Sequence, residues 1–89
     1  MIQRRARVRG GEIDIVARRG RTLAFVEVKA RASAEAANLS LDQHRLRRVA
    51  VAAEQLAPRF MRSGDNVRID AIFIIPGRWP RHLANVWQG

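Results

Sequence analysis

The chain has 89 residues, and its 17 Lys and Arg against 8 Asp and Glu give a formal net charge of +9. It contains no Cys, which excludes disulfides, thiolate catalysis and cysteine-based metal sites. No apolar run approaches the ~20 residues that cross a bilayer, and the basic start is not followed by an apolar signal segment. We therefore expect a single domain, residues 1–89, in a soluble cytoplasmic protein without a membrane partner.

The excess of arginine predicts a surface that attracts polyanions, with nucleic acid as the first candidate partner. The alternative is that arginine-rich composition reflects the genome and only aids solubility. Charge alone does not distinguish the two.

Three short strands are predicted in the first third of the chain. Residues 2–8, 12–17 and 22–28 carry apolar residues at strand spacing, and the sequence RRGR at 18–21 predicts a hairpin turn between the last two strands. The Ala-rich stretch 30–40 predicts a loop.

One main helix follows. Ser40 predicts its N-cap, and Gln43 stands at the position that closes a capping box. Apolar residues recur at helical spacing from Leu46 to Ala57, and Pro58 predicts the end of the helix.

Two strands are predicted after the helix. Residues 67–76 are nearly continuously apolar, which is typical of an interior strand, and residues 82–87 predict an edge strand. The order βββαββ predicts an α/β fold with a mixed sheet of about five strands and one main helix.

Four charged residues interrupt the second and third strands: Glu12, Asp14, Glu27 and Lys29. Strand residues alternate between faces, so Glu12 and Asp14 share one side, and Glu27 and Lys29 share one side. An even-length hairpin loop would place position 12 opposite 27 and position 14 opposite 25, so that all four converge on one face. An odd-length loop would divide them.

Three carboxylates this close repel one another unless some are protonated or a divalent cation binds them. Oxygen ligands favour Mg²⁺ or Mn²⁺, and Lys29 would add a positive charge beside the ion. The competing interpretation is a salt bridge between Glu27 and Lys29, with Glu12 and Asp14 as ordinary surface residues.

The stretch RGGEIDIVARRGRTLAFVEVKAR at 9–31 resembles the signature of the YraN-like uncharacterised proteins, which belong to the endonuclease-like PD-(D/E)XK superfamily. The similarity continues through DQHRLRRVAVAAEQLA, VRIDAIFI and HLANVW. This resemblance implies a restriction-endonuclease-like fold.

The resemblance also implies a site. It makes Asp14 and Glu27 the metal ligands, adds the backbone carbonyl of Val28, and gives Lys29 a catalytic role, with Glu12 as an additional ligand. The implied activity is a nuclease that acts on DNA with Mg²⁺ or Mn²⁺.

Four arginines and one glutamine, after the third strand and on the helix, are candidates for contacts with nucleic acid: Arg31, Gln43, Arg45, Arg47 and Arg48. For Gln43 the capping box is the alternative role. The competing function is a nucleic-acid-binding module that keeps the scaffold without catalysis.

Family members usually begin with a helix that packs against the sheet, whereas this chain begins almost at its first strand, so we expect that helix to be missing. The side formed by Ile13, Ile15, Val26 and Val28 would then lack a cover, and a second copy of the chain is a candidate to supply it.

Five other residues receive predictions. Arg68 and Asp70 predict an ion pair on one strand face, and His82 predicts a solvent-facing or hydrogen-bonded side chain. Of the two tryptophans, Trp79 is a candidate for stacking on a base, and we expect Trp87 to pack in the core.

Overall fold

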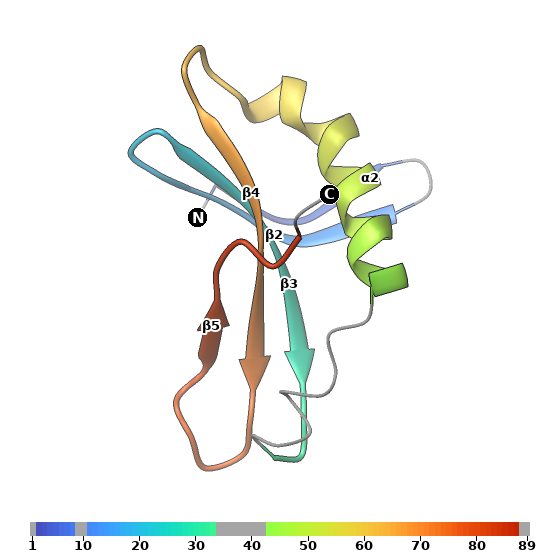
Figure 1. Cartoon of the computed structure of the whole chain (residues 1–89), viewed down its shortest axis with the longest axis vertical. Coiled ribbons are helices and arrows are strands. Elements are labelled where there is room, and N and C mark those ends of the chain that lie inside the picture. Colours follow the sequence, from blue (N-terminus) through green and yellow to red (C-terminus); the bar gives the residue numbers. More distant parts are fainter. Residues whose placement is uncertain (1, 9–10, 34–42, 88–89) are drawn as a thin grey trace.

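The structure is a computed structural model that describes residues 2–8, 11–33 and 43–87. It forms a five-stranded sheet in the order β1-β2-β3-β4-β5, with helix α2 packed on it (Figure 1). The elements are β1 (Gln3–Val8), β2 (Gly11–Arg19), β3 (Thr22–Ala30), α2 (Gln43–Phe60), β4 (Asn66–Ile74) and β5 (Arg81–Leu83). Strands β3 and β4 are parallel, and the other neighbours are antiparallel. The predicted α/β class with a mixed sheet is confirmed and is consistent with a restriction-endonuclease-like fold.

The β2–β3 hairpin turns through Gly20 and Arg21, since Arg19 pairs with Thr22. Gly20 has a φ of 59°, and a glycine in this conformation at the first turn position favours a two-residue hairpin. A loop at residues 19–20 or 18–21 would pair 12 with 27 and 14 with 25, so this predicted pairing is wrong by two positions. Because the loop is still even in length, the expected parity of the two strands holds where they pair.

The core lies between α2 and one face of the sheet. Its buried apolar residues are Ala6, Ile13, Val16, Leu23, Phe25, Leu46, Val49, Ala52, Ala53, Leu56 and Ile69. Trp87 packs against this core, as predicted. The N-cap prediction at Ser40 lies outside the described residues.

The helix does not end at Pro58 but continues to Phe60. A proline this close to the C-terminus of a helix removes only its own N–H donor, so the last turn still forms. Arg18 of β2 then holds this helix end: its Nη2 donates to the Phe60 carbonyl at 2.8 Å and contacts Asp65 Oδ2 at 2.7 Å.

Strand β2 does not alternate regularly. Ile13 and Val16, three residues apart, are both buried in the core under α2, whereas strict alternation would place them on opposite faces. The pairing of β1 with β2 skips the level of Arg5 and Asp14, and Arg5 has a φ of 52°. The expected single apolar side is therefore wrong, because the kink turns Ile13 toward the helix, away from the face assigned to Ile15.

Close packing of α2 on β2 depends on Gly11. A Cβ at this position would lie 3.2 Å from the Ala52 Cβ, which is tighter than normal van der Waals contact. Glycine therefore lets the helix approach the start of β2.

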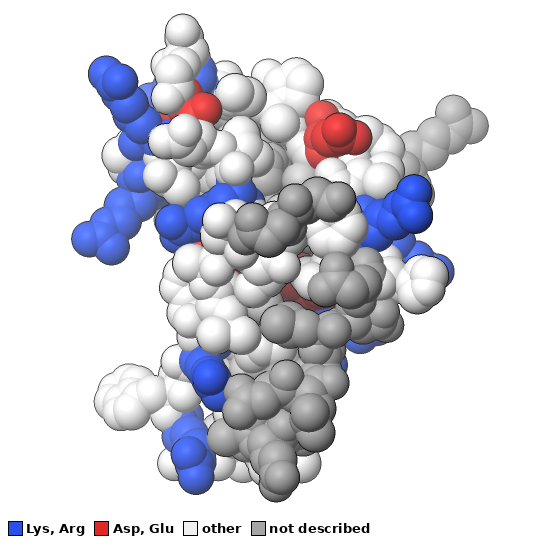
Figure 2. Space-filling model, viewed as in Figure 1, with Lys and Arg blue, Asp and Glu red and all other residues white. Residues whose placement is uncertain are grey.

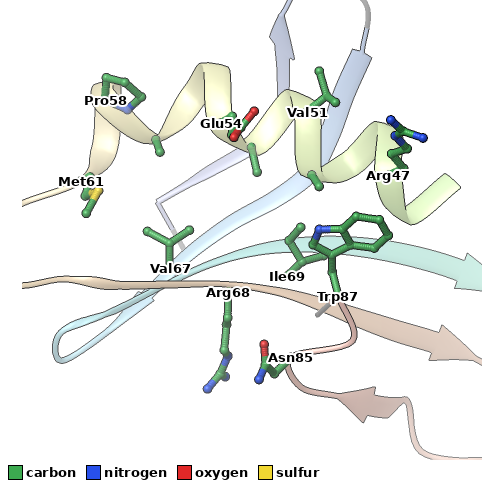
Figure 3. A pocket seen from close by; sticks show the side chains of 13 residues that line it. Arg47, Val51, Glu54, Pro58, Met61, Val67, Arg68, Ile69, Asn85 and Trp87 are labelled. Atoms are coloured by element: carbon green, nitrogen blue, oxygen red, sulfur yellow. The ribbon is translucent and has the colours of Figure 1, made fainter. Parts of the chain in front are cut away.

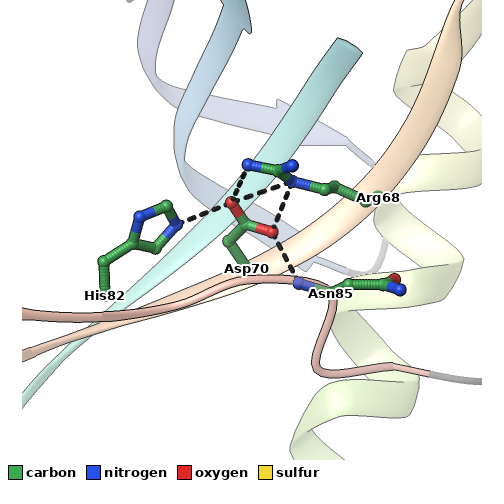
Figure 4. A network of polar contacts seen from close by, with 4 residues as sticks. All are labelled: Arg68, Asp70, His82 and Asn85. Atoms are coloured by element: carbon green, nitrogen blue, oxygen red, sulfur yellow. Dashed lines mark hydrogen bonds and ion pairs between the residues drawn. The ribbon is translucent and has the colours of Figure 1, made fainter.

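On the sheet face that points away from α2, Asp70 is 1% exposed and accepts several hydrogen bonds (Figure 4). Arg68 Nε donates at 2.9 Å, His82 Nε2 lies 2.7 Å away, and the Asn85 backbone N–H donates at 2.9 Å. The predicted ion pair and the predicted hydrogen-bonded histidine are both confirmed.

The same carboxylate explains why the last strand is shorter than predicted. The backbone leaves β5 after Leu83, and Asn85 has a φ of 54°. This turn aims the Asn85 N–H at Asp70, and Val86 N–H then donates to the Ile69 carbonyl at 2.8 Å. Asp70 therefore anchors the C-terminal segment to β4.

Within the described part of the chain, no helix is both long and apolar enough to span a membrane.

We predict that Asp70→Asn lowers the free energy of unfolding by about 2 kcal/mol near neutral pH, because an amide NH₂ would face the Arg68 and His82 donors. Urea denaturation measures this loss.

The loss should also depend on pH. Burial raises the pKa of Asp70, but the bonds from Asn85, His82 and Arg68 together outweigh it and lower the pKa. The stabilisation is therefore complete above the unfolded pKa of about 3.9 and disappears as the pH falls through the lower folded pKa. The difference between wild type and variant should shrink below about pH 4; a constant difference would contradict this role.

Candidate functional site

Asp14 reaches from β2 to β3 at the point where the two strands separate. The β2–β3 ladder ends at the pair Ile15–Val26. Beyond it, Asp14 Oδ2 accepts the backbone N–H of Val28 at 2.8 Å. The kink in β2 thus removes Asp14 from both ladders and places its carboxylate against the backbone of β3.

The Val28 carbonyl faces the same gap. In an extended strand the N–H and C=O of one residue point to the same side, and the Val28 N–H points toward Asp14. The carbonyl therefore also points toward the space that β2 leaves. This is the carbonyl that the sequence prediction names as a metal ligand.

Glu27 and Lys29 lie next to this gap and form an ion pair, with Lys29 Nζ 2.7 Å from Glu27 Oε1. Their side chains are only 15% and 16% exposed. The competing sequence interpretation is thus correct for this pair. It does not describe Asp14, which is hydrogen-bonded across the strands.

Glu12 lies nearby but does not join Asp14 and Glu27. It pairs with Arg7 at 3.2 Å in an exposed contact. Among residues 2–8, 11–33 and 43–87, no group of three or more His, Cys, Asp or Glu is arranged to hold a metal. The expected convergence of three carboxylates is therefore wrong, because the kink in β2 breaks the alternation on which it rested.

The remaining donor set still suits a hard cation. It comprises the carboxylates of Asp14 and Glu27 and the Val28 carbonyl, and Mg²⁺ is commonly held by one or two carboxylates together with water and phosphate. The contacts described here use Oδ2 of Asp14 and Oε1 of Glu27.

A pocket of about 240 Å³ brings this charged region against the helix. Glu12 and Glu27 line it from the sheet, and Arg45 and Arg48 line it from the first turns of α2, together with Gly11 and Val49. Arg45 and Arg48 are three residues apart and so share a helix face. The pocket thus combines carboxylates with two cations that can bind a phosphate.

The other predicted phosphate contacts are dispersed. Arg47 does not line the pocket of Glu27; it lines two other pockets, one of them together with Arg48. Arg31 follows β3, and its guanidinium lies 5.9 Å from the centre of the Phe73 ring. The side chain of Gln43 lies outside the described residues.

A pocket of about 610 Å³ forms an apolar groove between α2 and β4 (Figure 3). The partly exposed side chains of Val51, Met61 and Val67 line it, and Trp87 lies near its Arg47 end. Asp14, Glu27 and Lys29 do not line it. The groove is therefore separate from the charged site.

Basic groups are spread over the molecule and are not confined to the pocket. On the face in Figure 2, Lys and Arg side chains lie near the β2–β3 hairpin, beside α2 and at the lower end of the sheet. With a net charge of +9, this distribution suits contact with an extended polyanion.

Sequence reasoning missed two features of the site. The kink in β2 has no signal in the alternating pattern of EIDIV, because it arises where β1 and β2 bend together. The shared pocket of Arg45 and Arg48 was readable from helical spacing, since residues three apart share a helix face.

The sequence pattern of the uncharacterised protein family UPF0102 matches residues 1–74. The chain is 57% identical to a UPF0102 protein of Sphingopyxis alaskensis over 88 residues, which are 99% of this chain and 76% of the relative. A UPF0102 protein of Rhizorhabdus wittichii is 55% identical over 96% of this chain and 72% of its own length. A third, from Erythrobacter litoralis, is 46% identical over 99% of this chain and 76% of the relative. The chain therefore belongs to the uncharacterised protein family UPF0102, the YraN-like family that its sequence resembles.

Proposed function

We propose that this protein is a metal-dependent nuclease that hydrolyses phosphodiester bonds in DNA. The observation that carries the proposal is the position of the Asp14 carboxylate, 2.8 Å from the Val28 N–H and outside both strand ladders. This carboxylate lies on the strand next to Glu27 and Lys29, and one or two carboxylates with water and phosphate are the ligands that commonly hold Mg²⁺.

Asp14 and Glu27 would hold Mg²⁺ or Mn²⁺ with the Val28 carbonyl as the third protein ligand. The ion would lower the pKa of a bound water and neutralise charge on the scissile phosphate. Before substrate arrives, Lys29 balances the charge of Glu27 across 2.7 Å. With substrate bound, the Lys29 ammonium would stabilise the charge that develops on the phosphate.

Arg45 and Arg48 would bind the phosphates beside the bond that is cleaved. They line the same pocket as Glu27 and project from one face of α2. Guanidinium groups bind phosphate oxygens through paired N–H donors, so these two residues would position the backbone without reading sequence.

The second candidate function is a nucleic-acid-binding module without catalysis. The observation that favours it is the closed ion pair between Glu27 and Lys29, since a carboxylate already neutralised needs no cation. In that case the basic residues would still bind phosphates, and the Asp14–Val28 bond would only join two strands.

We predict that Asp14→Asn and Glu27→Gln each reduce Mn²⁺-dependent cleavage roughly 100-fold or more, while binding measured in EDTA stays within about 3-fold of wild type. Cleavage of labelled single-stranded, duplex, nicked and branched DNA measures the first effect. Fluorescence anisotropy measures the second.

Glu54→Gln is the matched control for these variants, because Glu54 is an exposed carboxylate that lines the separate apolar groove. It should cleave as wild type does. If the wild-type protein binds these substrates but cleaves none of them with Mn²⁺ or Mg²⁺, the binding module is the correct function.

We also predict that Arg45→Ala combined with Arg48→Ala weakens DNA binding and lowers the slope of log affinity against log salt by about 2, near 1 for each lost phosphate contact. Arg59→Ala combined with Arg62→Ala is the matched control, because both side chains are exposed at the far end of α2. Equal slopes for the two double variants would show that the pocket does not contact phosphate.

A further inference from the structure

The loop between β4 and β5 presents a tryptophan to solvent. Trp79 is 92% exposed, the highest value among the exposed large apolar side chains of the described residues. Two arginines, Arg78 and Arg81, stand close to it in the sequence, and both are exposed. The faces of this aromatic ring are therefore accessible to a partner.

The backbone holds Trp79 in this position. The Arg78 N–H donates to the Ile75 carbonyl at 3.2 Å, with Pro76 and Gly77 between them and a φ of 72° at Gly77. Proline followed by a glycine of positive φ is the pattern of a type II turn.

Pro80, directly after Trp79, restricts that residue to an extended conformation. The loop is anchored at both ends, because Ile75 is buried and Arg81 pairs with Phe73 in the sheet. An aromatic ring presented by a fixed backbone loses little conformational entropy when it binds.

The loop emerges near the candidate site. Lys29 and Arg81 both pair with Phe73, one from β3 and one from β5, so the three residues form a row across the sheet. Directly paired residues face the same side of a sheet. The loop begins after Ile74, which pairs with Ala30. Ile74 is one residue, or about 3.3 Å along the strand, beyond the row of Lys29, Phe73 and Arg81. Figure 1 shows it at the C-terminal end of β3.

Positively charged side chains lie between the candidate site and the loop. Arg31 lies over the Phe73 ring at 5.9 Å, so Lys29, Arg31 and Arg81 surround one aromatic residue. A concave region of about 510 Å³ follows, lined by Ile75, Gly77, Arg78, Trp79, Pro80 and Arg81. A row of cations that leads to an exposed ring matches a nucleic-acid strand, whose phosphates bind the cations and whose bases stack.

We infer that Trp79 is a stacking platform for an unpaired base of a strand whose phosphates follow Lys29, Arg31 and Arg81. This inference rests on the proposed function and defines its substrate class: nucleic acid with a single-stranded segment beside the cleaved bond. Bases in a continuous duplex are already stacked and do not offer a face to the ring.

The test is binding of a short mixed-sequence single-stranded oligonucleotide, measured by anisotropy in EDTA so that no cleavage occurs. Trp79→Ala should weaken binding roughly 10-fold, and Trp79→Phe should retain most of the affinity because it keeps a ring. For an abasic oligonucleotide of equal length and for a duplex, Trp79→Ala should change affinity by less than about 2-fold, because neither offers a free base face.

Met61→Ala is the matched control, because Met61 is 46% exposed and lines the groove between α2 and β4. It should bind as wild type does. Intrinsic fluorescence adds a direct signature: the oligonucleotide should quench wild-type emission, and Trp79→Phe should remove most of that quenching while Trp87 remains.

Equal affinity of wild type and Trp79→Ala for the single strand would overturn the inference, as would undetectable binding by wild type. Binding to phosphatidylserine vesicles that depends on Trp79, without such dependence for the oligonucleotide, would assign the ring to a membrane surface instead. The nuclease proposal fails separately: absence of metal-dependent cleavage would refute it while Trp79-dependent binding stands.

Discussion

The hydrogen bond from the Val28 N–H to Asp14 Oδ2 is the contact on which the candidate site depends. Where β2 bends away from β3, a backbone N–H would be left without a strand partner, and an unsatisfied donor in a partly buried position is costly. The Asp14 carboxylate replaces the missing strand. Because Asp14 takes the place of a strand partner, its acidic group lies at the backbone beside Glu27. One hydrogen bond therefore satisfies the Val28 N–H and also places a carboxylate in the gap between β2 and β3.

The packing of α2 completes the site from the other side. Gly11 allows the helix to approach the start of β2 to within contact of Ala52. That approach places Arg45 and Arg48 over the same pocket as Glu12 and Glu27. A site with anionic ligands on the sheet and cations on the helix can bind a metal and a phosphate together, which is what phosphodiester hydrolysis requires.

The sequence predicted the order of the elements, the mixed sheet and the family because those depend on local patterns: alternation in the strands, helical spacing from Leu46 to Ala57, and the EIDIV and EVK segments. It could not predict the kink at Asp14, since the positive φ of Arg5 and the shared bend of β1 and β2 are properties of the pair of strands. The hairpin register failed by two positions for a related reason, because Gly20 takes the first turn position and not the second.

The most direct test of the proposed metal site is the position of Mn²⁺ in a crystal structure of the protein grown with that ion, located by anomalous scattering. We expect an anomalous peak in contact with the carboxylates of Asp14 and Glu27 and the Val28 carbonyl. A map in which Mn²⁺ binds elsewhere, while Asp14 still accepts from Val28 and Glu27 still pairs with Lys29, would contradict it.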